Sequence, residues 1–517
     1  MRGIVPKKIK GFRDIDATLS QLKWQIINSA SKIYKKYGYE HWDTPVLEYA
    51  DCLGKYLPDS NEVAEGVYSF KNPEIEPVYS SKGDELRDEN NNVIMENHFL
   101  TMRYDLTAPL ARVYAESLWM LHIRGQVEAG KTPLFRRYQF GPVYRFEAKL
   151  DPGRFREFWQ LDFDTVGTED VSADAENCMI LSDALEAVGL KRGTYIVKVN
   201  NRKILKGLLN NYGISDENQE QAIMRIVDKI DKIGKKGVEL ELGNGRTDEQ
   251  SGAKIEGLGL KNEFVEKIIE FLSDFEIKAS RKKILGKLIS KVSDNKIYNE
   301  GIEELKKIDS ILENLGFDEN RVIFDPTLIR GMGYYTGPIF EVESLQSYSD
   351  EKGRERKVGS ICGGGRYDGL VEKLIGLKVP ATGASIGVDR LAELLTLTNQ
   401  VSDLADGPVL ITVFDENLMS EYQKIAYNLR QNNIDTEIYY GSKKGLKHQL
   451  AYADKKNCPI AILLGEDEMK KGVVSVRNLK LGKQLASQIT DKNEWKQRVQ
   501  AEVKIEEVAE EIKKLLV

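Results

Sequence analysis

The chain has 517 residues, which is more than one ordinary domain holds, so we expect two or three domains. Apolar residues make up 41% and charged residues 30% of it, a composition typical of a soluble globular enzyme. The net charge of −6 argues against a general DNA or RNA coat protein, and no apolar run is long enough to span a membrane.

Cysteine and histidine are rare and scattered, with four of each. Their spacing matches neither a disulfide framework nor a zinc site, so we expect a reducing compartment and no protein-bound metal. The basic segment 1–16 lacks the apolar core of a secretory signal and predicts no targeting peptide. Together these features predict a cytoplasmic protein with no membrane or DNA partner.

The first part of the sequence predicts a helix followed by an extended segment. Residues 19–37 carry apolar side chains at helical spacing, and Gly38 ends this predicted amphipathic helix. Pro45 lies within the extended segment 39–46, which predicts a strand at a sheet edge or an interface. Residues 57–98 are polar and predict loops or a hairpin. The apolar positions that predict the helix are Leu22, Ile26, Ile33 and Tyr37.

Two β-rich runs, Tyr138–Phe146 and Phe155–Val166, flank a loop that contains Asp-Pro-Gly. This turn chemistry predicts an antiparallel pair with a long connecting loop. Further along we expect strands at Val322–Phe324, Ile339–Glu343 and Val358–Ile361, a helix at Tyr367–Ile375 and a strand-to-helix unit at Thr382–Leu397.

The pattern divides the chain into a β-rich domain with an insertion and a separate terminal domain. The insertion, 205–318, is rich in Lys and Glu and predicts helices. After a polar linker, strands and helices alternate from Val409 to Leu464, which predicts a mainly parallel α/β domain. Residues 493–517 look helical, with Val503, Val508, Ile512 and Leu516 on one face. The expected boundaries are 1–204, 205–318, 319–398, 399–407 and 408–517.

The common nucleotide-binding fingerprints are absent, and the glycine-rich stretch Gly363–Gly369 does not fit them. Arginines are the better signal, because a permanently charged, planar guanidinium suits phosphate oxygens. Any single arginine is more often an ordinary surface residue. The candidates are Arg145, Arg154, Arg156, Arg330 and Arg390.

At this point the sequence resembles a family. Three patches are similar to the signature motifs of class II aminoacyl-tRNA synthetases, and the class I signatures are absent. Two further patches are similar to the signatures of the histidyl enzymes, whereas the resemblance is weak over the insertion. The class II patches are Thr44–Glu48 (TPVLE), Gly141–Glu147 (GPVYRFE) with Gly153–Phe158 (GRFREF), and Gly383–Leu391 (GASIGVDRL); the histidyl patches are Arg330–Gly337 (RGMGYYTG) and Gly364–Leu370 (GGRYDGL).

The resemblance implies an α+β catalytic domain with a mixed, mainly antiparallel sheet, and a homodimer formed through the first motif. It implies an enzyme that activates L-histidine with ATP and transfers it to tRNA(His). Arg145 would hold the ATP α-phosphate, and Arg330 would contact both that phosphate and the histidine carboxylate, so both are assigned as catalytic. Mg²⁺ would accompany ATP without a dedicated protein site.

The same resemblance assigns the other ligand contacts. Glu147 would accept from the adenine amino group, Phe158 and Arg390 would sandwich the adenine, and Arg154 would lie near the terminal phosphates. Asp105, Thr107 and Gln160 would bind the amino group of histidine; Asp164 and Tyr335 would hold the two ring nitrogens. On spacing alone, Asp105, Gln160 and Asp164 are better explained as ordinary strand and loop polar residues. Gln160 and Asp164 lie an even number of positions apart on a predicted strand, so we expect them to share one face. The histidine-binding set is Asp105, Thr107, Gln160, Asp164, Arg330, Tyr334 and Tyr335.

The terminal domain resembles the family's anticodon-binding domain at Leu446–Ala453 and Gly465–Glu468. Residues 443–483 hold ten Lys or Arg against four Asp or Glu. Such a charge run is usually only a solvated face, but here it favours contact with tRNA phosphates. The tentative tRNA-binding residues are Arg156, Lys443, Lys447 and Arg477.

Two departures and two rival functions stay open. Gly333 stands where many relatives carry an acidic residue. The loop 148–152, which contacts the acceptor end of the tRNA in this family, differs from the usual bacterial pattern. Recognition of an extra 5′ guanosine of the tRNA therefore stays open. One rival is a non-catalytic paralogue that binds histidine as a regulatory subunit; the other is a class II synthetase for threonine or proline. The arginines and the terminal domain argue against the first rival, and the histidyl patches argue against the second.

Overall fold

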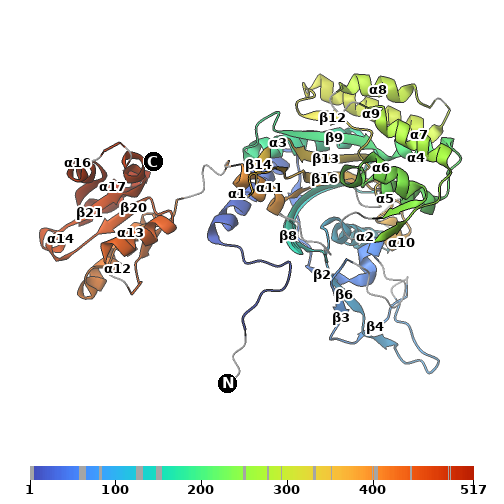
Figure 1. Ribbon diagram of the computed structural model, residues 1–517. Coiled ribbons are helices and arrows are strands. Elements are labelled where there is room, and N and C mark those ends of the chain that lie inside the picture. The colour runs from blue at the N-terminus through green and yellow to red at the C-terminus, as the bar shows by residue number, and fades with distance from the viewer. Residues whose placement is uncertain are drawn as a thin grey trace. The chain divides into compact units, whose positions relative to one another are not determined.

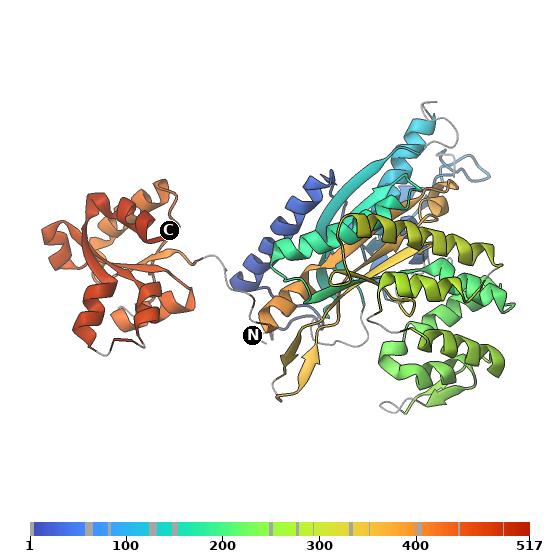
Figure 2. The same ribbon diagram turned by 90° about the horizontal axis from the view of Figure 1, so that it is seen from above.

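The computed structural model describes the chain except residues 1–4, 57–65, 81–83, 124–131, 147–153, 248–251, 276–278, 293, 330–333, 351, 399, 401–405, 443–444, 487, 490 and 517. The chain forms two compact units, Met1–Ser402 and Asp403–Val517, drawn in Figures 1 and 2. The boundary between the units falls inside the expected linker, 399–407. Within the described residues, no helix is both long enough and apolar enough to cross a membrane.

The described part of unit 1 is built on an eight-stranded sheet with the order β1-β7-β8-β17-β16-β13-β9-β12. Its inner pairs are antiparallel, and parallel pairs lie only at the two edges, β1 with β7 and β12 with β9. The expected mixed, mainly antiparallel sheet is therefore confirmed. The strands are β1 (Glu40–His41), β7 (Phe135–Tyr144), β8 (Glu157–Val166), β17 (Ala381–Gly387), β16 (Ser360–Arg366), β13 (Pro338–Ser344), β9 (Tyr195–Asn201) and β12 (Val322–Phe324).

Three helices pack together against this sheet: α1 (Ala17–Lys36), α3 (Ser172–Val188) and α11 (Val388–Leu397). The predicted first helix is confirmed as α1, which begins where Asp16 accepts the backbone N–H of Leu19 and ends before Gly38, whose φ is 82°. Leu22 and Ile26 lie on its buried face, with Ile33 and Tyr37 half-buried beside them.

The expected insertion consists of helices with two different partners. Helices α4 (Arg202–Asn211), α8 (Arg281–Ile289) and α9 (Lys296–Asn314) contact strands of the large sheet, and α9 also packs on α3. Helices α5 (Glu217–Val227), α6 (Ile230–Leu242) and α7 (Asn262–Ser273), with the hairpin β10 (Gly245–Thr247) and β11 (Lys254–Glu256), contact one another. Part of the insertion therefore extends the helical layer of the sheet.

Several short elements complete unit 1. The predicted strand at 39–46 is shorter than expected, because only β1 pairs there, at the sheet edge. The predicted helix at Tyr367–Ile375 is reduced to α10 (Glu372–Ile375), since the backbone of Tyr367 still pairs with Ala381 of β17. The other elements are β2 (Leu47–Tyr49), η1 (Ala50–Tyr56), β3 (Ser69–Lys71), β4 (Glu76–Pro77), β5 (Met95–Glu96), β6 (Phe99–Met102), α2 (Thr107–Ile123), β14 (Ser347–Ser349) and β15 (Glu355–Lys357).

Unit 2 has the predicted alternation of strands and helices from β18 to β20, but its sheet is not mainly parallel as predicted, because β21 and β22 join it as antiparallel strands. Its sheet order is β19-β18-β20-β21-β22, with β18 parallel to β19 and β20 and the other pairs antiparallel. The elements are β18 (Val409–Ile411), η2 (Glu416–Leu418), α12 (Met419–Gln431), β19 (Thr436–Ile438), α13 (Leu446–Lys455), β20 (Ile460–Leu463), α14 (Glu466–Lys471), β21 (Val473–Asn478), α15 (Leu479–Leu485), α16 (Lys492–Val499), β22 (Gln500–Lys504), η3 (Ile505–Glu507) and α17 (Val508–Leu516).

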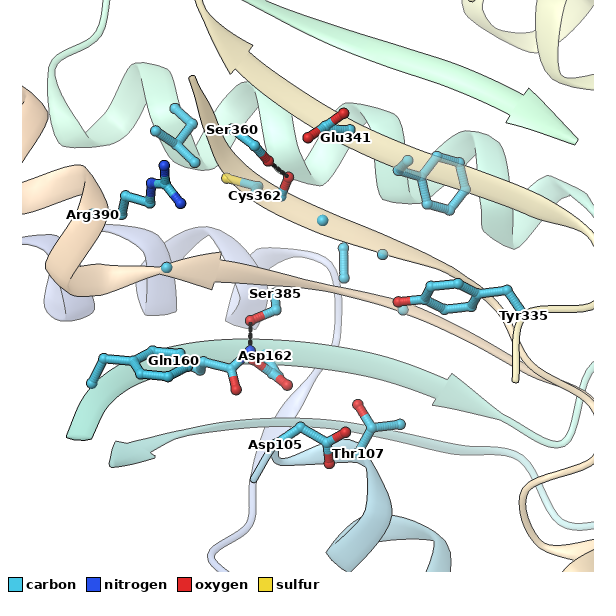
Figure 3. A pocket seen from close by; sticks show the side chains of 18 of the residues that line it. Asp105, Thr107, Gln160, Asp162, Tyr335, Glu341, Ser360, Cys362, Ser385 and Arg390 are labelled. Carbon is cyan, nitrogen blue, oxygen red and sulfur yellow. Dashed lines mark hydrogen bonds between the residues drawn. The ribbon is translucent and has the colours of Figure 1, made fainter. Parts of the chain in front are cut away.

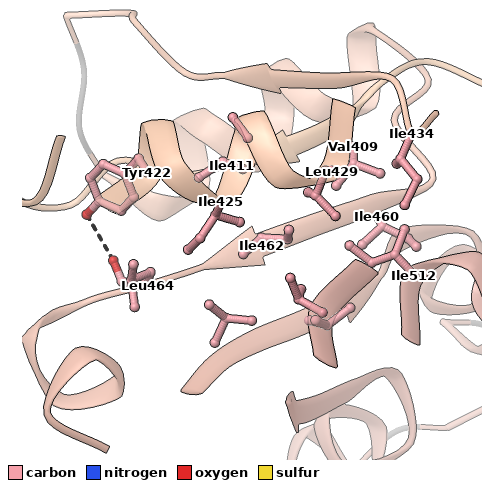
Figure 4. Packing of buried hydrophobic residues seen from close by; sticks show 14 of the residues in the cluster. Val409, Ile411, Tyr422, Ile425, Leu429, Ile434, Ile460, Ile462, Leu464 and Ile512 are labelled. Carbon is pink, nitrogen blue, oxygen red and sulfur yellow. Dashed lines mark hydrogen bonds between the residues drawn. The ribbon is translucent and has the colours of Figure 1, made fainter. Parts of the chain in front are cut away.

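The tail of the chain completes the core of unit 2. The prediction of one helical face was wrong at Val503, which lies on β22 because this segment pairs with β21. Val508 and Ile512 of α17 are buried in one cluster with Ile460 and Leu429, as Figure 4 shows for Ile512. The partner of the tail is therefore the sheet and α12 of its own unit.

We predict that Ile512→Ala destabilises unit 2 by about 2–5 kcal/mol, because it leaves a cavity in a packed core. Guanidinium titration of the full chain, followed by circular dichroism, should show an earlier transition. Leu516→Ala, on the exposed part of the same helix, should change stability by less than about 0.5 kcal/mol. Equal losses in the two variants would contradict this packing role.

Candidate active site

The two faces of β8 separate the core of unit 1 from a cleft. Leu161 and Phe163 are fully buried, and the Phe163 ring lies 4.8 Å from that of Tyr34 on α1. Because side chains alternate along a strand, Gln160, Asp162 and Asp164 point to the opposite face. There they line a cleft of about 400 Å³, part of which Figure 3 shows.

This cleft collects side chains from well-separated parts of the chain. They come from the start of α2, from the ends of β7 and β8, from the segment before β13 and from α11. The sequence-predicted residues that line it are Asp105, Thr107, Arg145, Arg154, Phe158, Gln160, Asp164, Tyr334, Tyr335 and Arg390.

The remaining candidates lie elsewhere. Glu147, Arg330 and Lys443 lie outside the described residues, as do Gly333 and the loop 148–152. Arg156 is 9% exposed, and its guanidinium lies 4.1 Å from the centre of the Phe146 ring. In unit 2, Lys447 is exposed on α13, whereas half-buried Arg477 donates to Gln500 Oε1 at 2.6 Å.

One end of the cleft is rich in carboxylates. The Tyr367 hydroxyl donates to Asp164 Oδ1 at 2.6 Å, and Arg137 lies 3.2 Å from Asp164 Oδ2. Asp105 accepts the backbone N–H of Ala108 at 2.9 Å, which ties it to the first turn of α2. Burial raises the pKa of Asp164, and the charge of Arg137 opposes that rise. This end therefore favours a cationic or hydrogen-bond-donating ligand.

Missing Cβ atoms make room for these side chains. A Cβ at Gly383 would collide with the carboxylate of Asp164, and one at Gly365 would lie 2.9 Å from the Tyr335 ring. Gly365 belongs to β16, which extends beyond the predicted strand Val358–Ile361. The glycine-rich stretch is thus a strand that lets neighbouring side chains approach closely.

Guanidinium groups gather at the other end. Arg145, Arg154 and Arg390 lie here with Phe158, and they also line an adjoining pocket of about 230 Å³. Arg145 Nε donates to the Tyr104 carbonyl at 2.9 Å, and its guanidinium lies 5.1 Å from the Phe158 ring centre. This end suits an anion such as a polyphosphate.

Asp389 fixes the start of α11 beside this end. Its buried carboxylate accepts from Arg13 at 2.5 Å, from Lys23 at 3.1 Å and from the backbone N–H of Trp159 at 2.5 Å. Arg390 follows directly and donates to the Val358 carbonyl at 2.9 Å. Contacts from the N-terminal segment, α1 and β8 therefore position the arginine that follows Asp389.

Sequence reasoning missed several residues of the cleft. Asp162 could have been found, because it lies between Gln160 and Asp164 on the face that these two were expected to share. Tyr367 lies inside the second histidyl patch, where its neighbour Arg366 instead pairs with buried Asp174 at 2.5 Å. Ser385 lies inside the third class II patch, although no role was assigned to it. No sequence signal pointed to the other side chains, which are Asp228, Lys232, Phe340, Glu341, Ser360, Ile361 and Cys362.

Comparisons with known proteins place the chain in a family. The family model described as Histidyl-tRNA synthetase matches residues 76–391, and the one described as Anticodon binding domain matches 408–515. A "Histidine--tRNA ligase" of Ruegeria sp. (strain TM1040) is 42% identical over 99% of this chain and 97% of that relative. The chain belongs to the histidyl-tRNA synthetase family. Another relative of that name, from Caulobacter vibrioides, is 41% identical over 94% of this chain and 91% of its own length.

Solved structures agree with the histidyl-tRNA synthetase fold. The crystal structure of histidyl-tRNA synthetase from Nostoc sp. PCC 7120 has a TM-score of 0.68 and 27% identity, covering 99% of this chain and 100% of that one. A structure described as an ATP phosphoribosyltransferase regulatory subunit/histidyl-tRNA synthetase from Bacillus halodurans C has a TM-score of 0.61 and 21% identity. It covers 90% of this chain and 99% of that one, and it shares the fold.

In this member of the histidyl-tRNA synthetase family, we expect the ionisation of Asp162 to lower the free energy of unfolding as the pH rises. Burial, and then the charge of Asp164, raise the pKa of Asp162 from 3.8 to about 8. The unfolded chain loses this proton near pH 4 and the folded chain keeps it to about pH 8, so the folded state is progressively disfavoured between these values.

We therefore predict that Asp162→Asn raises the melting temperature relative to the wild type, and that the difference grows from pH 5 to pH 8. Each unit of pKa shift corresponds to ~1.4 kcal/mol. Thermal unfolding at several pH values measures the effect, with Asp294→Asn at an exposed position as the control. A difference that does not vary with pH would show that Asp162 ionises normally.

Proposed function

We propose that the cleft of unit 1 is where this histidine–tRNA ligase makes and uses histidyl-adenylate. A carboxylate oxygen of histidine attacks the ATP α-phosphorus, and pyrophosphate leaves. A hydroxyl of the terminal ribose of tRNA(His) then attacks the activated carbonyl carbon, loses its proton, and AMP leaves. The observation that carries the proposal is the convergence of predicted side chains on one cleft, with carboxylates at one end and guanidinium groups at the other.

At the guanidinium end the ligand is ATP. Arg145 contacts the α-phosphate, where negative charge develops during attack, and a cation held in advance lowers the barrier there. Arg154 lies near the terminal phosphates, and Phe158 and Arg390 enclose the adenine. Arg330, which lies outside the described residues, bridges the α-phosphate and the histidine carboxylate. Glu147, also outside them, accepts from the adenine amino group.

At the carboxylate end the ligand is histidine. Asp105, Thr107 and Gln160 bind its α-ammonium group, with Tyr334 beside them. Asp164 and Tyr335 hold the ring nitrogens, and the bond from Tyr367 to Asp164 supports that geometry. An analogue that lacks a ring nitrogen leaves buried polar groups without partners, so it is rejected strongly.

Mg²⁺ bound to the ATP phosphates would neutralise charge on the leaving pyrophosphate. Within the described residues, the side chains form no cluster of three or more His, Cys, Asp or Glu that could hold a metal. The chain's own contribution at the phosphates is therefore its arginines.

Unit 2 contacts tRNA, as its match to the anticodon-binding family supports. Lys447 is exposed on α13, and Lys443 and Arg477 belong to the same basic stretch. These cations contact phosphates and set register. A role for Arg156 in tRNA binding remains a prediction, as does the cytoplasmic location.

A second copy of the chain packs against the two small sheets of unit 1, β2-β6-β3 and β4-β5. Large apolar side chains are exposed on β2, β3 and β5, among them Leu47, Tyr49, Phe70 and Met95. A gathering of exposed apolar side chains is typical of a protein interface. This supports a homodimer that includes the first class II motif, Thr44–Glu48.

Amino-acid-dependent ATP–pyrophosphate exchange tests the activation step. Histidine should support exchange, and Arg330→Ala should lower the rate by orders of magnitude while ATP still binds, because the lost cation acts mainly in the transition state. Arg498→Ala, on exposed α16, is the matched control. Exchange with threonine or proline instead would refute the specificity for histidine. Exchange with no amino acid would favour the rival function, a non-catalytic regulatory subunit that binds histidine.

We predict that Lys447→Ala weakens tRNA(His) binding and reduces the salt dependence by about one counter-ion, as expected for a phosphate contact. Filter binding over a range of salt concentrations measures both, and pyrophosphate exchange should stay unchanged. Lys504→Ala, an exposed lysine on β22, is the control. If tRNA affinity is the same in both variants, Lys447 does not contact tRNA.

A further inference from the structure

Asp162 lies at the centre of the carboxylate end and has no role in the function proposed so far. It is 2% exposed, on β8 between Gln160 and Asp164, and it lines the cleft. Among the described residues, none donates a hydrogen bond to its Oδ1 atom. A buried carboxylate oxygen without a donor is costly to the fold, so its presence calls for a reason other than packing.

Ser385 connects Asp162 to Gln160. It pairs directly with Asp162 across β17 and β8, and hydrogen bonding to Ser385 lowers the pKa of Asp162. Gln160 Nε2 donates to Ser385 Oγ at 2.7 Å, as drawn in Figure 3. With its amide nitrogen held in this way, Gln160 turns Oε1 away from Ser385. Within the described part of the chain, Oε1 is buried and receives no hydrogen bond.

Neighbouring carboxylates add negative charge to the buried acceptors of Asp162 and Gln160. The carboxylates of Asp164 and Asp105 raise the pKa of Asp162, so the three are close enough to repel one another. Arg137 opposes them, but it also donates to the carbonyl of Leu106 at 2.5 Å and to Gln139 at 3.1 Å. In Figure 3, Asp105 and Thr107 lie together on one side of Gln160 and Asp162. An ammonium group offers three N–H donors and a positive charge, which matches these acceptors.

We propose that Asp162 accepts a hydrogen bond from the α-ammonium group of histidine and makes the cleft select an amino acid that carries this charge. Ser385 is the positioning residue that orients Asp162 and Gln160 together. The inference rests on the proposed function, in which histidine occupies this end of the cleft. The free protein keeps a proton on Asp162 to about pH 8, and a bound ammonium group favours loss of that proton, so Asp162 becomes a charged acceptor when histidine binds.

The test compares two ligands and two kinds of variant by isothermal titration calorimetry on the full chain. The ligands are L-histidine and imidazole-4-propionate, which lacks only the amino group. Asp162→Asn keeps the shape of the side chain but cannot ionise. It should weaken the binding of histidine about tenfold to a hundredfold, because hydrogen bonds to charged groups have that strength. The affinity for the des-amino ligand should fall less than twofold. Asp294→Asn should change neither affinity.

Ser385→Ala keeps the carboxylate and removes the link. It should weaken the binding of histidine about threefold to tenfold, with little change in the affinity for the des-amino ligand. This variant also tests the inference if Asp162→Asn fails to fold. Equal losses for both ligands in either variant would indicate a merely structural role and overturn the inference, as would unchanged histidine affinity. Wild-type protein that lacks histidine-dependent exchange would instead refute the proposed function.

Discussion

The alternation of side chains along β8 is the constraint on which unit 1 depends. Leu161 and Phe163 attach the sheet to its helical layer, and the residues between them form the floor of the cleft. A shift of one residue in register would exchange the two sets and place apolar groups in the cleft. The core packing that stabilises the domain thus also places the carboxylates, so the geometry of the site follows from the fold.

The buried carboxylates of the cleft destabilise the folded state when no ligand is bound. Asp162 and Asp164 are buried next to each other, and their pKa values rise because ionised carboxylates are poorly solvated there. By contrast, Asp389 is buried among Arg13, Lys23 and a backbone N–H, which compensate its charge. The first pair faces the cleft, whereas Asp389 holds α11 in place. Compensation is missing where a substrate would supply it, a pattern expected of functional sites.

Sequence patterns predicted the strands and helices with strong periodicity, such as α1, β7 and β8, and the family resemblance predicted ten of the residues that line the cleft. The failures have physical causes. The helix expected at Tyr367–Ile375 and the helical face through Val503 were overruled by pairing with distant strands, β17 and β21. Asp228 and Lys232 reach the cleft from the insertion, where the chain carries no recognisable motif. Contacts between residues far apart in sequence leave no local signal.

The glycines of β16 and β17 show why a strand can carry a binding motif. At Gly365 and Gly383 the missing side chains leave space that Tyr335 and Asp164 occupy, and these are the residues assigned to the imidazole ring. Substitution at either glycine would move a recognition group before it touched the ligand itself. In the proposed function, Gly365 and Gly383 therefore set how closely Tyr335 and Asp164 approach the imidazole ring.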